Sequence, residues 1–276
     1  MSNKVVILGN KRQLCALGQG TWGMGKSSAR RKDEIKALRH GLELGMSVID
    51  TAEMYDNEEL VGEAIRDCRD KAFVVSKVLP GNAGYLETKR ACERSLRRLG
   101  IECINLYLLH WIGRYDFSET IKAFVELKQE GKIEFWGMSN LDVADMEKVI
   151  SLPHGEDCVT NQVLYNLKDR GVEFDLLPWS LQHGMPVMAY SPIGEGKLRN
   201  DVTLASIAER HGATPAQIAL AWVLRRDGVM AIPKAGSMKH VEENFNSMSI
   251  ELTEEDLCEL DAHFPAPSHK IPLAGW

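Results

Sequence analysis

Four residues that can take part in proton transfer stand where apolar segments of the chain end. Asp50, Lys77 and His110 each close an apolar run, and Tyr55 follows Asp50 after a short turn. An ionisable group is costly to place there, because desolvation disfavours its charged form unless another group compensates. Four such placements in one chain indicate a functional site.

The four side chains together suit the protonation of a carbonyl oxygen. A free phenol has a pKa of about 10, so Tyr55 can act as an acid near neutral pH only if a cation stabilises the developing phenolate. We expect Lys77 to be that cation, Asp50 to keep it protonated, and His110 to orient the substrate oxygen. Reduction of the carbonyl also requires a hydride donor of the nicotinamide type. Taken singly, each residue also fits a structural role, and Asp50 with Lys77 fits a structural ion pair.

The predicted strands bring these groups to one end of a sheet. Side chains two residues apart on a strand point the same way, so Lys77 shares a face with Val75, and His110 shares one with Leu108. Asp50 ends a third apolar segment in the same manner. Three successive strands therefore converge on one site.

The whole chain alternates apolar segments of strand length with amphipathic helical segments. Strands are predicted at about 16–20, 47–50, 72–77, 104–109, 133–138, 159–163, 186–190 and 229–232. Glycines just after the helical runs supply left-handed stops, at Gly45, Gly100, Gly131 and Gly184. Strands separated by helices pair in parallel, so we predict an α/β fold with one domain, a (β/α)8 TIM barrel over residues 1–276. An open doubly wound sheet is the alternative.

The segments outside the eight pairs of strand and helix are predicted to add a hairpin and extra helices to the barrel. Residues Lys4 to Leu17 are typical of a β-hairpin around Gly9-Asn10 that covers the bottom of the barrel. Extra helices are expected near the C-terminus at about 202–211, 215–226 and 253–264, the last two with N-caps at Thr214 and Thr253.

Composition excludes several classes of protein. The chain has 276 residues and a formal net charge of -6, which argues against a nucleic-acid surface. No apolar run is long enough for a membrane span or a secretory signal, so we expect a cytoplasmic location. The six cysteines have no Cys-x-x-Cys spacing, so we expect them to be reduced and mostly buried, with no metal site.

One segment matches the dinucleotide-binding pattern G-x-G-x-x-G, from Gly18 to Gly23. That pattern has meaning only when its glycines lead straight into a helix and an acid ends the next strand. Here the helical pattern begins only at about Arg30, and Glu43 falls inside it. We therefore interpret the match as a coincidence, with Trp22 lining a pocket.

The sequence blocks resemble those of the aldo-keto reductase superfamily from Gly20 to about Pro265. The blocks are Gly45-x-x-x-Ile49-Asp50-Thr51-Ala52-x-x-Tyr55, Ser76-Lys77-Val78, Leu108-Leu109-His110-Trp111, Gly137-Met138-Ser139-Asn140 and Ile232-Pro233-Lys234. The chain is most similar to short bacterial reductases of methylglyoxal and other small aldehydes. The resemblance implies an NADPH-dependent carbonyl reductase on a (β/α)8 barrel, with Asp50, Tyr55, Lys77 and His110 as its catalytic tetrad and Tyr55 as the general acid.

The resemblance also implies a nucleotide site. Its expected residues are Gly20, Thr21, Trp22, Asp50, Ser139, Asn140, Gln162, Tyr190, Ser191, Pro192, Leu198, Ile232, Lys234, Ser237, His240 and Asn244. A serine and an arginine that the family often has near the adenosine are replaced here by Ala235 and His240. Because arginine binds a phosphate bidentately and a neutral histidine does not, we expect a weaker preference for NADPH, with NADH possible as a cofactor.

The substrate pocket is expected to be apolar and small. Its predicted lining is Trp22, Met24, Met54, Tyr55, Leu79, His110 and Trp111. The loop after Trp111 and the tail from Ser268 are short, which favours small aldehydes over bulky ketones. We expect a monomer, as the family implies. Two other functions stay open: an aldolase that forms a Schiff base on Lys77, and a nucleotide-binding barrel that reports redox state without significant turnover.

Overall fold

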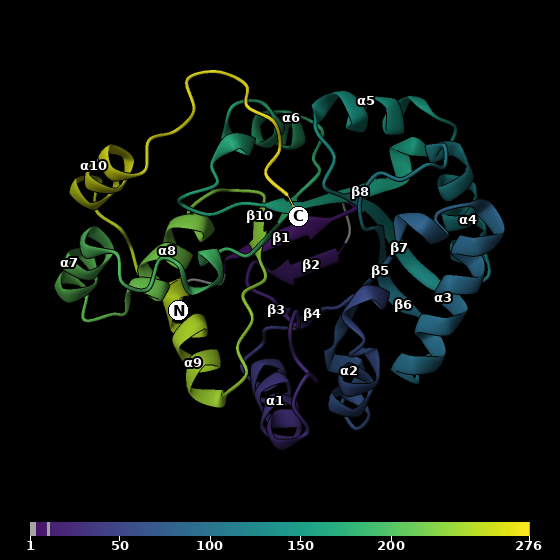
Figure 1. Ribbon diagram of the computed structural model, residues 1–276, viewed down its shortest axis with the longest axis horizontal. Coiled ribbons are helices and arrows are strands. Elements are labelled where there is room, and N and C mark those ends of the chain that lie inside the picture. Colours follow the sequence, from purple (N-terminus) through teal and green to yellow (C-terminus); the bar gives the residue numbers. More distant parts are fainter. Residues whose placement is uncertain (1–3, 10–11, 276) are drawn as a thin grey trace.

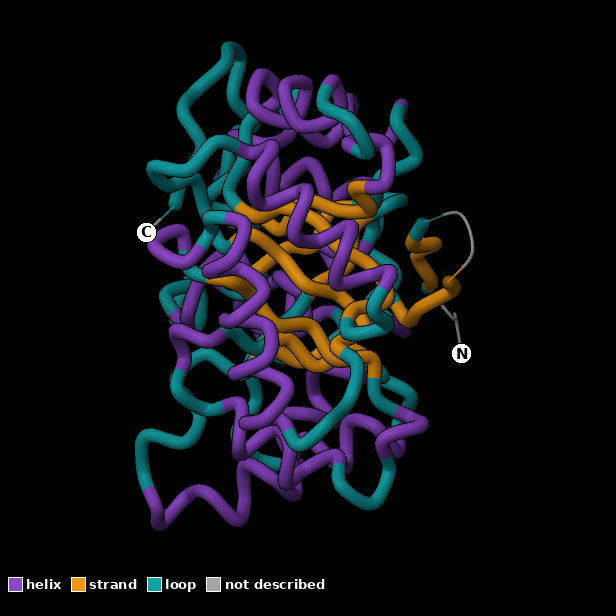
Figure 2. The backbone as a smooth tube through the Cα atoms, turned by 90° about the vertical axis from the view of Figure 1, so that its right-hand side faces the viewer, coloured by secondary structure: helices purple, strands orange, loops and turns teal. Residues whose placement is uncertain are grey.

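The computed structural model describes residues 4–9 and 12–275, and its centre is a sheet of parallel strands. Within these residues the sheet has eight strands in sequence order: β3 (Gln19–Gly20), β4 (Val48–Asp50), β5 (Phe73–Val78), β6 (Ile104–Leu109), β7 (Ile133–Ser139), β8 (Cys158–Leu164), β9 (Val187–Tyr190) and β10 (Val229–Ala231). Isolated parallel bridges from Leu17 to Ala231 and from Gly20 to Lys234 join its two edges. The sheet thereby curls into a barrel, as Figures 1 and 2 show.

The strands are apolar because both of their faces are covered. Every residue of β5 is buried, and β-branched valines fill half of it. Such strands suit a parallel sheet whose inner face packs on itself and whose outer face packs on helices. The register pairs Asp50 with Val75 and Lys77 with Leu108, so the ends of β4, β5 and β6 lie side by side.

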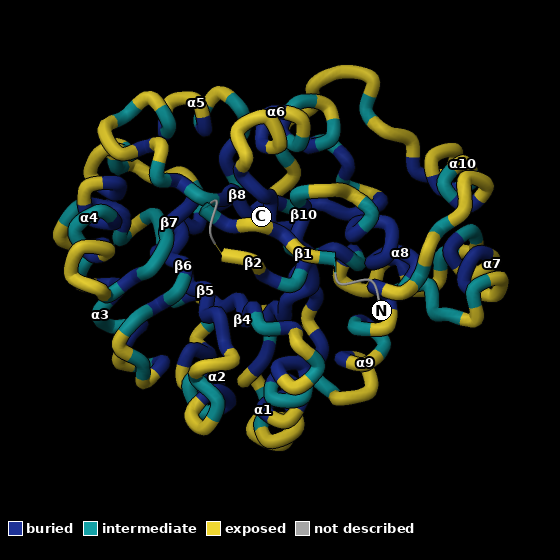
Figure 3. The backbone as a smooth tube through the Cα atoms, turned by 180° about the vertical axis from the view of Figure 1, so that it is seen from behind, coloured by how far each residue is buried: buried dark blue, intermediate teal, exposed yellow. Residues whose placement is uncertain are grey.

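Helices surround the strands, with their outer faces exposed (Figure 3). Their bounds are α1 (Ser28–Glu43), α2 (Glu58–Ile65), α3 (Tyr85–Leu99), α4 (Phe117–Gln129), α5 (Val143–Ser151), α6 (Leu176–Gln182), α7 (Val202–Arg210), α8 (Pro215–Leu224), α9 (Met238–Asn246) and α10 (Glu254–His263). Gly100 follows α3 with a φ of 64°, a left-handed conformation that glycine adopts without strain. Thr214 opens α8 with the predicted capping box.

The hairpin and the tail lie at opposite ends of the barrel. Strands β1 (Val5–Leu8) and β2 (Arg12–Cys15) pair in antiparallel fashion and stand on one side of the barrel, whereas the C-terminal end lies on the other (Figure 2). Residue Asn10 of the predicted turn lies outside the described residues.

The predicted fold class, the hairpin and the extra C-terminal helices are confirmed. Helix α9 was not predicted, although Ser237 caps it. The cysteines are less buried than expected, because only Cys92 and Cys158 are classed as buried and Cys258 is exposed. Helix α1 begins at Ser28, several residues after Gly23, so the glycine motif does not lead straight into a helix. No described helix has the length and apolar character needed to cross a membrane.

Candidate active site

A buried ion pair lies at the ends of β4 and β5. Lys77 Nζ donates to Asp50 Oδ1 at 2.6 Å and to the carbonyl oxygen of Thr51 at 2.8 Å. The side chain of Lys77 is fully buried and that of Asp50 is 3% exposed. Gln162 of β8 donates to the other carboxylate oxygen of Asp50 at 2.8 Å. Both oxygens of the carboxylate are therefore satisfied, as a buried charge requires.

Tyr55 completes this arrangement from a short 3-10 helix, Glu53–Tyr55, that follows β4. Its hydroxyl lies 3.4 Å from Lys77 Nζ. Burial raises the pKa of Tyr55, and the positive charge of Lys77 opposes that rise without cancelling it. Lys77 therefore lowers the pKa of Tyr55, as expected. The net shift of this pKa is nevertheless upward, because burial has the larger effect. Tyr55 consequently keeps its proton throughout the neutral pH range.

Lys77 remains charged despite its burial. Desolvation alone would lower its pKa, but the nearby Asp50 carboxylate and the Tyr55 hydroxyl outweigh it, so the pKa of Lys77 lies above its usual value. A protonated ammonium is not a nucleophile. This charge state argues against a Schiff base on Lys77.

His110 lies beside Tyr55 as a neutral ring. The ring centroids of Tyr55 and His110 are 5.7 Å apart, and Trp22 contacts Tyr55 from another side at 4.9 Å. Burial, together with the charge of Lys77, lowers the pKa of His110 to about 2. Its Nδ1 is buried and has no hydrogen-bond partner among the described residues. His110 can therefore donate or accept a hydrogen bond in the site without carrying charge.

This charge state predicts how acid affects stability. Below a pH of about 6.5 His110 gains a proton in the unfolded chain, whereas the folded protein resists that proton because the pKa is about 2. The free energy of unfolding should therefore fall by up to about 1.4 kcal/mol for each pH unit below that point. Denaturant unfolding of the native protein and of His110→Gln between about pH 7 and about pH 5 measures the contribution, because the variant should lack it. If the free energy of unfolding changed equally with pH in the two proteins, His110 would make no such contribution.

A cavity of about 650 Å3 opens above the tetrad. Many of the predicted residues line it: Gly20, Thr21, Trp22, Asp50, Met54, Tyr55, His110, Trp111, Tyr190, Ser191, Pro192, Ile232 and Lys234. The lining also includes residues that were not predicted: Ile193, Glu195, Gly196 and Pro233. Three of them belong to the loop after β9, and their position directly after a predicted strand end was a signal that could have found them.

Two predicted pocket residues lie elsewhere. Met24 is only 1% exposed and belongs to the hydrophobic core, so it does not line the cavity. Leu79 also lies outside the lining, where its backbone N–H donates to Glu53 Oε1 at 2.6 Å. The other five predicted pocket residues do line the cavity: Trp22, Met54, Tyr55, His110 and Trp111.

A second chain of hydrogen bonds connects the strands behind the cavity. Tyr190 donates from its hydroxyl to Asn140 Oδ1 at 2.9 Å, and Asn140 Nδ2 donates to the carbonyl oxygen of His110 at 3.0 Å. Ser139 donates to the carbonyl oxygen of Gln162 at 2.8 Å. Ser139, Gln162 and Tyr190 belong to β7, β8 and β9, and Asn140 directly follows β7, so four residues of the predicted nucleotide site lie together next to the tetrad.

Four residues of the predicted nucleotide site, Leu198, Ser237, His240 and Asn244, do not line this cavity. Leu198 is 1% exposed. Ser237 caps α9 and accepts the backbone N–H of His240 at 3.4 Å. His240 is exposed in the first turn of the helix, whereas Asn244 is buried. Ser237 and His240 thus lie at the N-terminus of α9, a position that favours a phosphate.

The C-terminal tail ends at the cavity, an arrangement that the sequence did not predict. Lys270 pairs with Asp175 at 3.0 Å. A side chain at position 275 would begin 3.8 Å from Asn140 Oδ1 and 4.0 Å from the Tyr190 hydroxyl. The tail, yellow in Figure 1, thus runs from α10 back to the centre of the barrel.

Comparisons with known proteins agree with this geometry. The model of the aldo/keto reductase family matches residues 16–264. Methylglyoxal reductase YeaE of Escherichia coli K12 is 49% identical over 281 aligned residues, which cover 99% of each chain. Glyoxal reductase of Bacillus subtilis is 33% identical over 87% of each chain.

Solved structures are similar along the whole length as well. An aldo/keto reductase from Klebsiella pneumoniae in complex with NADP and acetate has 47% identity, a TM-score of 0.96 and coverage of 99% of each chain. An aldo-keto reductase from the same organism in complex with NADPH also has 47% identity and a TM-score of 0.96, with full coverage of each chain.

Proposed function

Because the chain belongs to the aldo/keto reductase family, we propose that it is an NADPH-dependent reductase of small aldehydes and 2-oxo aldehydes such as methylglyoxal. The observation that carries the proposal is the Tyr55 hydroxyl in the wall of a cavity, 3.4 Å from a buried ammonium. Two of the relatives are named as reductases of methylglyoxal and of glyoxal. Their substrates share a small size and an activated carbonyl.

The residues of the cavity fit an NADPH molecule. Tyr190 offers an aromatic face near the tetrad, and Lys234 offers a cation at the other end of the same lining. Gly20 lies so close to the opposite backbone that a Cβ there would be 2.6 Å from the carbonyl oxygen of Ile232. We propose that Ser139, Asn140 and the other predicted nucleotide residues hold the cofactor, which supplies the hydride.

Residues of the protein itself carry out the proton transfer. Tyr55 donates its proton to the carbonyl oxygen of the substrate, and His110 hydrogen-bonds the same oxygen. Lys77 stabilises the phenolate that forms, because it lies within 3.4 Å and stays charged. Asp50 acts through Lys77 and holds the ammonium in place.

The direct test is consumption of NADPH with methylglyoxal, glyceraldehyde and benzaldehyde as substrates. We expect many turnovers per protein molecule with the small aldehydes, and slower turnover with benzaldehyde. Binding of NADPH without turnover would instead support the redox-reporting function. Trapping of a covalent adduct by borohydride would support the aldolase, which the charged state of Lys77 disfavours. The single domain, the monomeric state and the cytoplasmic location stay predictions.

His240 should contribute to the preference for NADPH over NADH. If His240 hydrogen-bonds the phosphate on the adenosine ribose, His240→Ala should weaken NADPH binding by up to about tenfold. NADH is the control, because it lacks that phosphate and its affinity should not change. Titration of each nucleotide into the native protein and into His240→Ala measures both effects. Equal affinities of the two proteins for NADPH would show that His240 does not contact the phosphate.

The tail should contribute to substrate binding. Deleting residues 273–276 should raise the KM for methylglyoxal by up to about tenfold, equivalent to about 1.4 kcal/mol, because the wall at Asn140 and Tyr190 becomes open to water. Trp276, the last residue of the deleted segment, lies outside the described residues. The kcat should stay within about twofold, since the tetrad is untouched. A KM that does not change would show that the tail has no part in the pocket.

A further inference from the structure

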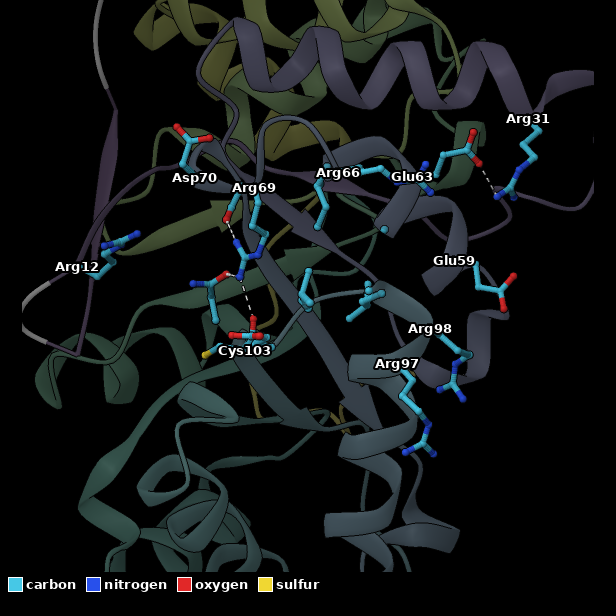
Figure 4. A pocket seen from close by; sticks show the side chains of 18 residues that line it. Arg12, Arg31, Glu59, Glu63, Arg66, Arg69, Asp70, Arg97, Arg98 and Cys103 are labelled. Atoms are coloured by element: carbon cyan, nitrogen blue, oxygen red, sulfur yellow. Dashed lines mark hydrogen bonds and ion pairs between the residues drawn. The ribbon is translucent and has the colours of Figure 1, made fainter.

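A second cavity, of about 970 Å3, lies at the hairpin end of the barrel and is lined by six arginines. We call it the arginine groove, defined by Arg12, Arg31, Arg66, Arg69, Arg97 and Arg98. Its wall includes Ala72 and Cys103, which precede β5 and β6, whereas the tetrad lies where those strands end. The groove is therefore separate from the cavity above the tetrad. Figure 4 shows the side chains that line the groove.

Two of the six arginines are neutralised within the protein. Arg31 pairs with Glu63 at 2.8 Å. Arg98 Nε donates to Glu58 Oε2 at 2.6 Å, and Glu58 is itself buried. These two pairs stabilise the packing of α1, α2 and α3, and their charges are not available to a ligand.

Arg69 is held rigidly by neutral groups. Its guanidinium donates to the carbonyl oxygens of Ala72 at 2.6 Å and Cys103 at 2.8 Å, and to Asn105 Oδ1 at 2.8 Å. Figure 4 shows it near the centre of the groove with these bonds drawn. It makes no ion pair with any described residue within 4.0 Å. Partial burial lowers its pKa, and the charge of Glu134, whose carboxylate accepts from Asn105 Nδ2 at 2.8 Å, opposes that shift. A fixed, half-buried guanidinium that makes no direct ion pair attracts an external anion.

Three more arginines reach the groove from different elements. Arg12 comes from β2, Arg66 follows α2, and Arg97 lies in the last turn of α3. All three are exposed, and within the described part of the chain none forms an ion pair. Helix dipoles favour cations at helix C-termini, which explains why arginines occur at positions 66 and 97. The dipoles do not explain Arg12, which lies on a strand, or Arg69.

The acidic residues of the groove stand at its rim. Glu59, Asp70 and Glu102 line it, are exposed, and make no ion pair with a described arginine. Once the pairs Arg31–Glu63 and Arg98–Glu58 are set aside, four arginines of the groove remain against these three acids, an excess of one positive charge. The whole chain carries a net charge of -6, so this local excess of positive charge is opposite in sign to the protein.

We propose that the arginine groove binds a small oligophosphate, with Arg69 as the fixed contact and Arg12, Arg66 and Arg97 as flexible ones. A guanidinium binds phosphate oxygens bidentately, which a halide ion cannot match. The unpaired arginines come from separate elements around a cavity that is larger than one phosphate group. Several linked phosphates can contact them together. The proposal does not depend on the proposed reductase activity.

Calorimetric titration with sodium tripolyphosphate tests the proposal. The protein is first saturated with NADP+, so that the cavity above the tetrad is not accessible to the phosphates. We expect one binding site to remain. The double variant Arg66→Gln/Arg97→Gln should weaken binding by about tenfold or more, since it removes two charged hydrogen-bonding groups. The matched control is Arg90→Gln, which removes an exposed arginine from α3 outside the groove and should change the affinity by less than about twofold.

Three results would overturn the assignment: loss of binding when NADP+ is present, equal weakening by Arg90→Gln and by the double variant, or no binding at physiological salt. Titration with ATP distinguishes the sources of the phosphates. Equal affinity for ATP and tripolyphosphate supports recognition of the phosphate chain alone. Tighter binding of ATP supports a nucleotide whose base packs on the apolar residues Ile65, Leu99 and Ile101 of the same wall.

Discussion

Replacing Tyr55 by Phe is expected to lower turnover of methylglyoxal by roughly a hundredfold to ten-thousandfold, the usual contribution of a positioned general acid. The substitution removes one hydroxyl and keeps the ring, so the contact with Trp22 at 4.9 Å should persist. The kcat should fall, whereas the dissociation constant of NADPH should change little, because Tyr55 serves the carbonyl oxygen. Steady-state kinetics and a nucleotide titration measure the two effects separately.

A matched control excludes a loss of folding as the cause. Tyr115 is another partly buried tyrosine, outside the cavity lining, and Tyr115→Phe should leave turnover within about twofold. If Tyr55→Phe retained more than about a tenth of native turnover, another group would have to donate the proton. His110 could not readily do so as an imidazolium, because its pKa is held at about 2.

Replacing Lys77 by Met should lower the free energy of unfolding by about 3–5 kcal/mol, as the removal of one partner from a buried ion pair does. The Asp50 carboxylate would then be buried without its cation, with only Gln162 and the surrounding backbone to stabilise it. Because the pKa of Lys77 is raised, the pair contributes fully below the usual lysine pKa and is lost only as the pH rises through the folded value. Denaturant unfolding at neutral pH measures the loss, and turnover should fall with it.

The double variant Asp50→Asn/Lys77→Met distinguishes a buried charge from lost packing. Removing both charges should restore part of the stability, and the interaction energy from a double-mutant cycle should exceed about 1 kcal/mol. A loss of under about 1 kcal/mol in Lys77→Met alone would show that the ion pair contributes little to folding. Turnover should stay low in the double variant, because the ammonium beside Tyr55 is absent.

The strands and the tetrad were predictable because their causes are local. An apolar run that ends in Lys77 or His110 predicts a strand. It also predicts the direction of that last side chain, because successive side chains along a strand alternate between its two faces. Glycines after helical runs set the helix ends in the same way, as the positive φ of Gly100 illustrates. Parallel pairing of neighbouring strands then brings these groups together.

Other features depend on contacts that a sequence pattern does not contain. Met24 was predicted to line the pocket, but its side chain packs into the hydrophobic core instead. The net direction of the Tyr55 pKa depends on the balance between burial and the charge of Lys77, and residue types alone do not measure burial. The path of the tail towards Tyr190 arises from contacts distant in sequence, such as that between Lys270 and Asp175.

The most direct test of the account uses NADPH deuterated at the transferable position of its nicotinamide. Native protein, excess methylglyoxal and the labelled cofactor are incubated, and the product alcohol is examined by mass spectrometry. The account predicts one deuterium in the product for each NADPH oxidised, over many turnovers, and at least about a hundredfold less of this product from Tyr55→Phe within the same time. Oxidation of NADPH without deuterium in the alcohol, or equal product from Tyr55→Phe, would contradict it.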